Sequence, residues 1–357
     1  MYRITAVVMF LGLFLSAATW AYSSQPTYPE VTSGKEFAFP RDHGSHDAFR
    51  TEWWYFTGWL ETADGDPLGF QITFFRSRPE MATDNPSKFA PQQIIFAHAA
   101  LSDPQTGKLI HDQRIGRAGF EIIEASQKDA DVSLLDWQLT RTATGVFASK
   151  VTGQDFALDL KMEPSQIPML NGENGYSRKG PKPSQASYYY SVPQLKVGGS
   201  VIHGGKKLAV TGRAWLDREW SSDVLPENAV GWDWTGLNFD DGSALMAFQV
   251  RGADGDAVYA GGSFRSAEGK QIILSPDDIQ FKPRRIWTSP ETGADYPVEA
   301  EFVVRLDGEW VRYHLEPMFD AQELSGAFTP TYWEGAVSTS GGRGYLEMTG
   351  YAGKIAL

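Results

Sequence analysis

The stretch that says most about the fold runs from Trp54 to Arg76 and reads WYFTGWLETADGDPLGFQITFFR. Its two apolar segments flank Asp64-Gly65, a dipeptide typical of the tight turn in a β-hairpin. A second stretch, from Trp232 to Arg251, reads WDWTGLNFDDGSALMAFQVR and repeats the pattern around Asp241-Gly242. Such similarity between distant segments indicates an internal duplication. The sequence therefore predicts two copies of one β unit.

The rest of the chain also reads as strands separated by turns. Segments such as GFQITFFRS, FALDLKM, KLAVTGRAWL and AEFVVRL alternate apolar and polar residues, as half-buried strands do. Helical periodicity is scarce, and 36 Gly and 20 Pro would interrupt it. Closing into a barrel removes the exposed edges of an antiparallel sheet. We therefore expect an all-β protein with two tandem antiparallel β-barrels, at residues 38–218 and 219–357.

An insertion at residues 165–185 makes the first unit longer than the second. It is rich in Pro and Gly and carries clustered Lys and Arg, which favours an exposed surface loop. The alternative is a lid over a pocket.

The N-terminal residues indicate export. Arg3 precedes an apolar run from Ala6 to Ala18, and small residues follow, as in a secretory signal peptide. The run is too short for a comfortable transmembrane helix. We therefore expect a signal peptide at 1–21, a linker at 22–37, no transmembrane span in the mature chain, and a periplasmic or extracellular location.

Composition and missing motifs limit the function classes. The formal net charge of −12 disfavours nucleic acid as a partner. The chain has no Cys, which excludes disulfides and thiolate nucleophiles. Its histidines show no spacing typical of a zinc site, so no metal or cofactor is expected. No G-x-S-x-G nucleophile elbow, GxGxxG or P-loop is present, so the sequence supports neither a serine hydrolase nor nucleotide binding.

Aromatic rings are the most distinctive part of the composition, with 12 Trp, 14 Tyr and 21 Phe. In TEWWYFTGWL, residues 51–60, they would point to both sides of an extended strand. We interpret this segment as a strand between a barrel interior and a second covering surface, such as the partner barrel. Core packing is the alternative for each ring. The candidate ligand-contacting rings are Trp53, Trp54, Tyr55, Tyr189, Tyr190, Trp220, Trp232 and Trp234.

Three carboxylates are candidate catalytic acids. Asp217 and Glu219, in WLDREWSS, share one face of a strand, whereas Asp233 lies on the face opposite Trp232 and Trp234. An apolar, ring-lined pocket raises the pKa of a carboxyl and keeps it protonated, and aromatic faces stabilise a cation. The alternative for these carboxylates is a surface pair or hydrogen bonds to backbone amides.

Two further polar residues lie beside apolar strand residues. Glu52 would need a partner among its buried neighbours, and Arg76 or Arg78 on the following strand could provide it. His98, in IIFAHAALSD, could face a cavity or act as a hydrogen-bonded core histidine.

Several blocks in this order resemble the AttH-like family, which is related to carotenoid 1,2-hydratase (hydroxyneurosporene synthase) and often labelled predicted secreted hydrolases. The blocks are TEWWYFTGWL, SYYYSVPQL, GRAWLDREWSS, GWDWTGLNFDDGSALMAFQVR and YWEGAVSTSGGRGYLEMTGY. The resemblance covers roughly residues 39–351. It implies two tandem lipocalin-like β-barrels that handle hydrophobic molecules, and a hydratase chemistry in which a carboxylic acid protonates a carbon-carbon double bond.

The sequence departs from the hydratases in one block. They carry a histidine in the block equivalent to DREW, whereas this chain has Arg218 and Glu219. An arginine beside two carboxylates would favour their ionised form, and could instead clamp the two barrels together.

Three functions stay open. The first is binding of a lipid or isoprenoid-like hydrophobic molecule in an aromatic cavity. The alternative is a cofactor-free hydratase, isomerase or cyclase that uses a buried carboxylate as acid. The third is a scaffold for a protein complex, which would need no cavity of the size typical of ligand sites.

Overall fold

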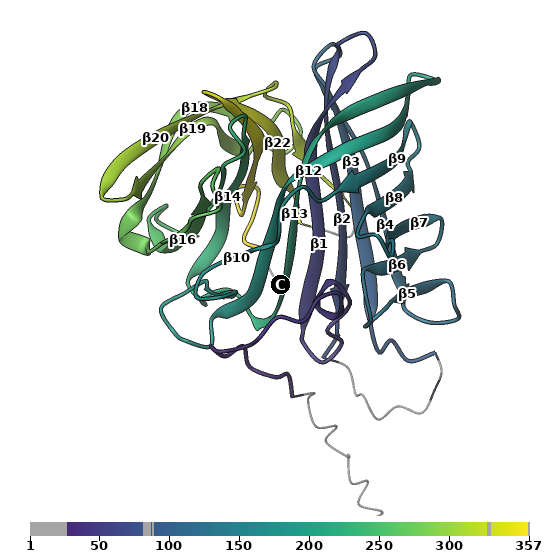
Figure 1. The fold of residues 1–357 in the computed structure, drawn as a ribbon, viewed down its shortest axis with the longest axis horizontal. Helices are drawn as coiled ribbons and strands as arrows, with labels where there is room; N and C mark the ends of the chain where they lie inside the picture. Colours follow the sequence, from purple (N-terminus) through teal and green to yellow (C-terminus); the bar gives the residue numbers. More distant parts are fainter. Residues whose placement is uncertain (1–26, 81–86, 88, 327–329, 356–357) are drawn as a thin grey trace, which may run out of the picture.

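The computed structural model describes residues 27–80, 87, 89–326 and 330–355. Within these residues the only helices are two 3-10 turns, η1 (Arg41–His43) and η2 (Pro276–Asp278). The rest is antiparallel sheet and loops, in two bodies side by side (Figure 1). The all-β prediction is confirmed. The predicted signal peptide lies outside the described residues, among which no helix is long and apolar enough to cross a bilayer.

The first sheet forms a ring of strands that follows the order of the chain. Strands β1 to β4 pair in sequence, and so do β5 to β9; β9 then pairs with β12, β12 with β13, and β13 with β1. The two ends of this path are β4 and β5, which do not pair, so the break in the ring lies between them. The strands β10 and β11 pair with β12 beside this path. The bounds are β1 (Thr51–Thr62), β2 (Pro67–Ser77), β3 (Ile94–Asp103), β4 (Lys108–Arg117), β5 (Ile123–Ala125), β6 (Asp131–Leu134), β7 (Trp137–Arg141), β8 (Phe147–Thr152), β9 (Phe156–Glu163), β10 (Met169–Leu170), β11 (Tyr176–Arg178), β12 (Ala186–His203) and β13 (Lys206–Asp223).

The second sheet repeats this plan with fewer strands. Its last strand, β23, pairs with its first, β14, and the break lies between β17 and β18. The predicted boundary after residue 218 falls inside β13, and the two sheets divide between Asp223 and Ala229. The bounds are β14 (Ala229–Phe239), β15 (Ala244–Gly252), β16 (Ala257–Arg265), β17 (Gln271–Leu274), β18 (Ile279–Thr288), β19 (Asp295–Leu306), β20 (Glu309–Pro317), β21 (Glu323–Leu324), β22 (Tyr332–Thr339) and β23 (Gly342–Thr349).

The two Asp-Gly turns open the two sheets in the same way. Gly65 and Gly242 both adopt positive φ, +88° and +91°, which glycine reaches without steric cost. In each turn the glycine N–H donates to the carbonyl of the last strand residue, Thr62 or Phe239. The matching hairpins, β1-β2 and β14-β15, confirm the internal repeat that the sequence predicts.

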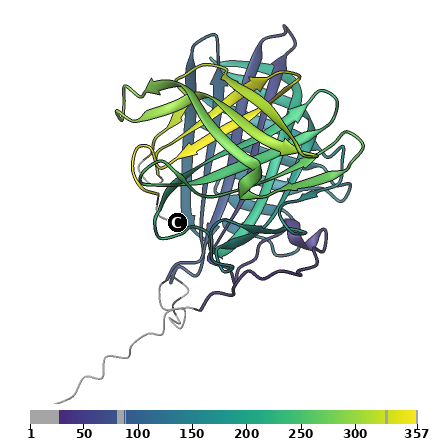
Figure 2. The same ribbon diagram turned by 90° about the vertical axis from the view of Figure 1, so that its left-hand side faces the viewer.

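Each barrel encloses an apolar core of its own, and a third apolar cluster lies between them. The first core contains Trp54, Phe56 and Leu216, and the second contains Leu237, Trp333 and Leu346. The third cluster includes Tyr55, Tyr189, Trp215, Trp234 and Phe248. Figure 2, turned by 90° from Figure 1, shows the strands of the two sheets crossing over one another. The cluster therefore fills the space where the outer faces of the two sheets meet.

Candidate ligand site between the two barrels

The alternation of side chains along β1 produces two different environments. Trp54 and Phe56 are buried in the core of the first barrel. Tyr55 belongs to the cluster between the barrels, against which Trp53 also packs. Strand β1 therefore lies between a barrel interior and the partner barrel, as the ring-rich sequence predicts.

A cavity of about 320 Å³ opens between the two sheets. This volume lies at the lower end of the range for small-molecule sites, roughly 300–1,000 Å³. Strands of both barrels contribute side chains to it, so neither barrel builds it alone. The aromatic rings that line it are Trp53, Tyr55, Phe75, Phe96, Tyr189, Trp232, Trp234, Phe248 and Tyr332.

Asp217 lines this cavity from β13, and three side chains donate hydrogen bonds to its carboxylate. Its carboxylate accepts hydrogen bonds from the Ser191 and Tyr189 hydroxyls and, at 2.6 Å, from Nε1 of Trp215. Burial raises the pKa of Asp217 to about 7, although the three donors oppose the shift. The carboxyl is therefore poised to exchange a proton near neutral pH.

Glu219 lies two residues further along the same face and has a cationic partner. Nζ of Lys179 is 3.0 Å from its carboxylate, and the Ser187 hydroxyl donates to it. Burial lowers the pKa of Lys179, while Glu219 opposes the shift. The lysine comes from the insertion predicted as an exposed loop. That prediction is wrong for Lys179, which is buried and lines the cavity.

The second barrel contributes two carboxyls that the sequence analysis did not select. Glu334 on β22 and Glu347 on β23 are direct cross-strand partners. Tyr55 donates its hydroxyl to Glu334, and Nε1 of Trp232 donates to Glu347 at 2.8 Å. Burial raises the pKa of Glu347 to about 8, and burial together with the Glu347 charge raises the pKa of Glu334 well above its usual value. In the sequence, both glutamates lie within apolar strand segments, WEGAV and YLEMTG. A carboxyl in such a segment is expected to be buried, and this signal could have identified them.

Gln71 on β2 and His98 on β3 add polar side chains of the first barrel to the cavity lining, and both contact Tyr332 on β22. The Tyr332 hydroxyl lies 2.8 Å from Nδ1 of His98 and accepts a hydrogen bond from Nε2 of Gln71 at 2.9 Å. Burial lowers the pKa of His98 to about 3, so the imidazole is neutral. His98 is thus hydrogen-bonded and also lines the cavity, which combines the two interpretations of its sequence.

The structure places the predicted site residues on two faces. Seven of them line the cavity: Trp53, Tyr55, Tyr189, Trp232, Trp234, Asp217 and Glu219. The other four are not among the lining residues, because strand alternation turns their side chains into a barrel interior. Of these, Trp54, Tyr190 and Trp220 lie in the first core.

Asp233 is the fourth. Its carboxylate accepts hydrogen bonds from Nε of Arg251 at 2.8 Å, Nε2 of Gln249 at 2.9 Å and the Tyr351 hydroxyl at 3.0 Å. Arg251 also lies over the Tyr351 ring, 3.8 Å from its centre. This ion pair belongs to the second barrel, so the proposed site does not include Asp233.

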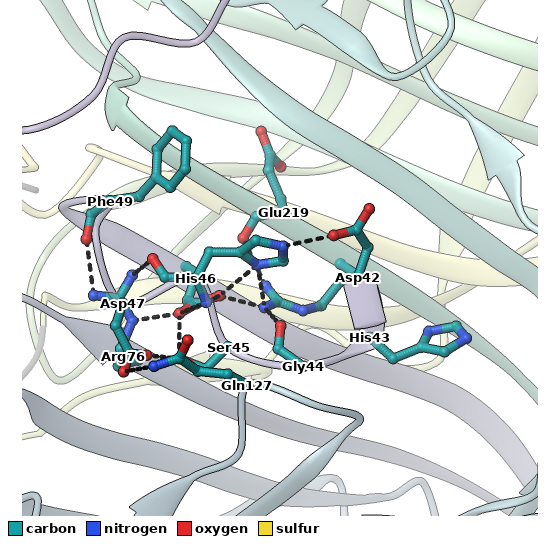
Figure 3. Close-up of polar contacts among 12 residues, drawn as sticks. Asp42, His43, Gly44, Ser45, His46, Asp47, Phe49, Arg76, Gln127 and Glu219 are labelled. Atoms are coloured by element: carbon teal, nitrogen blue, oxygen red, sulfur yellow. Dashed lines mark hydrogen bonds and ion pairs between the residues drawn. The ribbon is translucent and has the colours of Figure 1, made fainter. Parts of the chain in front are cut away.

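The interior of the first barrel holds a separate ionic cluster around Glu52, and Figure 3 shows its members His46 and Arg76. Arg76, as predicted, and Arg218 both bind its carboxylate, and the backbone N–H of His46 donates to it at 2.9 Å. His46 stacks on Trp220 with ring centres 3.7 Å apart. Burial alone would raise the pKa of Glu52, but the two guanidinium groups hold it well below its usual range.

This cluster corrects the expected role of Arg218. Arg218 lies between Asp217 and Glu219 in the sequence, and from this adjacency we expect it to favour their ionised forms. Its side chain instead points into the first barrel and pairs with Glu52, while the Glu219 carboxyl points away from the cluster (Figure 3). Arg218 therefore neither suppresses an acid in the cavity nor clamps the two barrels together.

Among the residues that the structure describes, no group of three or more His, Cys, Asp or Glu side chains is placed to hold a metal ion. The polar groups that line the cavity are carboxyls, phenols, one imidazole and one amine.

Comparison with known proteins gives a consistent picture. The model of the AttH-like family matches residues 30–351. A crystal structure of an AttH-type protein from Nitrosomonas europaea is 49% identical, with a TM-score of 0.82 over 90% of this chain and 99% of that one. Kievitone hydratase from Nectria haematococca is 17% identical, with a TM-score of 0.66 over 92% of this chain and 99% of that one, a likeness of fold.

A third structure, that of a protein named CghA, shares the fold at 12% identity, with a TM-score of 0.52 over 93% of this chain and 97% of that one. No curated protein sequence matches the chain. Because the family model covers nearly all of the described barrels, and the Nitrosomonas protein is nearly half identical along almost its whole length, this two-barrel chain belongs to the AttH-like family.

Proposed function

We propose that this protein binds a hydrophobic, lipid or isoprenoid-like small molecule in the cavity between its barrels. The observation that carries the proposal is the cavity itself, of about 320 Å³ and walled largely by aromatic rings. Rings of this kind contribute large apolar contact areas with little loss of conformational entropy. A scaffold without a ligand would have no need of such a space.

Tryptophan fluorescence gives a direct test, because Trp53, Trp232 and Trp234 line the cavity. Titration with farnesene, an isoprenoid hydrocarbon, is expected to change the emission saturably. Val250→Phe places a ring in the cavity and should weaken binding by about tenfold or more. Val311→Phe, on β20 and outside the lining, is the matched control and should bind like the wild type.

Native mass spectrometry of protein purified from its own host should also show a co-purifying lipid or terpenoid. If farnesene gives no saturable signal and no lipid co-purifies, the binding proposal is contradicted. Equal affinity of the Val250→Phe and Val311→Phe variants would contradict the location of the site.

A second candidate function is acid-catalysed hydration or isomerisation without a cofactor. The observation that favours it is the set of buried carboxyls facing one apolar cavity, in which the pKa of Asp217 is raised to about 7 and that of Glu347 to about 8. Glu347 has the Trp232 donor and no cationic partner among the described residues, so its protonated form is better retained than that of a salt-bridged acid.

The step would proceed as follows. The carboxyl proton moves to one carbon of an alkene, whose π electrons form the new C–H bond, and the other carbon becomes cationic. The faces of Trp234 and Phe248, which line the cavity, would stabilise that cation. A water oxygen then bonds to it and returns one proton to the carboxylate, which restores the acid. Loss of a proton from a neighbouring carbon instead gives isomerisation.

Incubation with farnesene in deuterium oxide tests this candidate. An active enzyme would incorporate deuterium into the alcohol or the isomerised alkene. Glu347→Gln should abolish incorporation and Asp217→Asn should lower it by about 100-fold or more, with farnesene binding retained. Asp159→Asn, an exposed carboxylate on β9 outside the cavity, is the control. If the wild type gives no incorporation above buffer with this or related isoprenoid and fatty alkenes, the enzymatic candidate fails and the binding proposal stands.

We also propose that the chain is exported by its N-terminal segment and acts in the periplasm or outside the cell. The apolar run after Arg3, followed by small residues, supports this. N-terminal sequencing of the protein from the periplasmic and culture fractions should find it to begin after Ala18 or Ala21. An intact N-terminus in the cytoplasmic fraction would contradict export.

A further inference from the structure

Three residues that line the cavity each carry a buried polar atom without a hydrogen-bond partner among the described residues. The atoms are Oε1 of Gln71, Nε2 of His98 and Oε2 of Glu334. All three side chains line the cavity, and their residues are at most 2% exposed. A buried polar atom left unpaired costs about 1–3 kcal/mol. Three of them on one cavity wall therefore point to a polar ligand group.

The strands bring these residues together from both barrels. Gln71 and Thr73 lie on one face of β2, and His98 is the direct partner of Thr73 on β3. Tyr332 reaches from β22 of the other barrel and contacts both Gln71 and His98 through its hydroxyl. Glu334 lies two residues further along β22, on the same face as Tyr332.

We assign the protonated nitrogen of His98 from its hydrogen bonds. The Tyr332 oxygen accepts from Nε2 of Gln71, and Nδ1 of His98 is the acceptor that these contacts offer to the Tyr332 proton. Because the imidazole is neutral, Nδ1 then acts as acceptor and Nε2 bears the hydrogen. The free Nε2 atom is therefore a hydrogen-bond donor.

The other two atoms are assigned in the same way. Nε2 of Gln71 is used by Thr73 and Tyr332, so its Oε1 is left as an acceptor. Glu334 accepts the Tyr55 hydroxyl on Oε1, and its protonated form offers a donor at Oε2. The wall thus presents one acceptor and two donors, which match the one donor and two lone pairs of a hydroxyl group.

We propose that Gln71, His98 and Glu334 form a subsite for a hydroxyl group, and that the ligand is an apolar molecule bearing an alcohol. This deepens the proposed binding function and rests on it. A carbonyl could accept from His98 and Glu334 but would leave Oε1 of Gln71 unpaired. A carboxylate would meet that acceptor oxygen directly and be repelled. The subsite therefore selects alcohols over aldehydes, acids and hydrocarbons of the same skeleton.

Three probes that differ only at one end test the proposal: farnesol, farnesal and farnesene. In the wild-type protein, farnesol is expected to bind about tenfold or more tighter than farnesene, with farnesal between them. Gln71→Leu removes the acceptor and should cancel the preference for farnesol over farnesal. His98→Phe removes a donor and should weaken both oxygenated probes while leaving farnesene within about twofold.

Phe96→Leu is the matched control, because Phe96 lines the same cavity two residues before His98 on β3. It should weaken all three probes by the same factor. Equal binding of the three probes to the wild type would overturn the subsite and leave the apolar site intact. A farnesol preference that persists in both Gln71→Leu and His98→Phe would also overturn it. No binding of any probe would overturn the proposed function, and the subsite with it.

Discussion

Glu52 and Glu347 are two glutamates that occupy opposite kinds of environment. Glu52 lies inside the first barrel and binds two arginines, which hold its pKa well below the usual range after burial has acted to raise it. Glu347 lies between the barrels with Trp232 as its donor, and burial raises its pKa to about 8. Cationic partners keep a buried carboxyl ionised as part of the framework, whereas burial without them favours its protonated form.

The same contrast separates the two faces of one strand pair. On β13, Arg218 points into the first barrel, whereas Asp217, one residue earlier, points into the cavity. On β1, Trp54 belongs to the core and Trp53 lines the cavity. Adjacent residues in the sequence therefore serve stability and binding separately, and each can be changed without its neighbour.

The largest effect is expected from Glu52→Gln. The substitution leaves Arg76 and Arg218 buried without their counter-charge, which should lower the free energy of unfolding by about 4–5 kcal/mol. Glu347→Gln replaces a protonated acid by a neutral amide of the same shape and should change it by less than about 1 kcal/mol at pH 6. Urea unfolding measures both values. Similar losses in the two variants would break the comparison.

Trp53→Ala and Trp54→Ala should separate binding from stability. Trp54 is 1% exposed in the first core, and its removal should cost about 3–4 kcal/mol because it leaves a cavity. Trp53→Ala should cost less stability but weaken farnesene binding by about tenfold or more. Thermal unfolding and fluorescence titration give the two readouts. A tenfold loss of affinity in folded Trp54→Ala, with none in Trp53→Ala, would reverse the assignment of faces.

The comparison also predicts a dependence of stability on pH. Asp217 and Glu347 bind protons more tightly in the folded state than in the unfolded state, where their pKa is about 4. Their contribution is full below that value and is lost as pH rises through about 7 to 8, so the free energy of unfolding should fall by several kcal/mol over this range. Glu52, with its lowered pKa, contributes in the opposite sense and only near and below pH 5, where the unfolded glutamate takes up a proton.

Urea unfolding at intervals between about pH 5.5 and pH 9, above the titration of unfolded glutamate, measures the slope. The Asp217→Asn, Glu347→Gln double variant should flatten it, and Glu52→Gln should leave its shape unchanged while lowering the whole curve. A slope of equal size in the double variant would assign it to other groups.

The site was only partly predictable from the sequence because it is assembled from two sheets. Parity along β13 and β14 correctly put Asp217 with Glu219 and set Asp233 apart from Trp232 and Trp234. It could not say which face was the interior of a barrel and which met the partner barrel. The sequence alone therefore predicts two sets of rings as ligand contacts: Trp54, Tyr190 and Trp220, and Trp53, Tyr55 and Tyr189. In the structure strand alternation turns the first set into the barrel core and the second set toward the cavity.

Local pattern alone determined the all-β class, the duplication and the two Asp-Gly hairpins, because strand alternation and turn chemistry act over a few neighbouring residues. Only the tertiary structure paired Arg218 with Glu52, brought Lys179 to Glu219, and placed Glu334 and Glu347 in the same cavity as His98 and Asp217. Those contacts join residues that are far apart in the chain or point away from their sequence neighbours. The pKa of each buried acid depends on such contacts, so its role was fixed by the packing of the two barrels and not by its own segment.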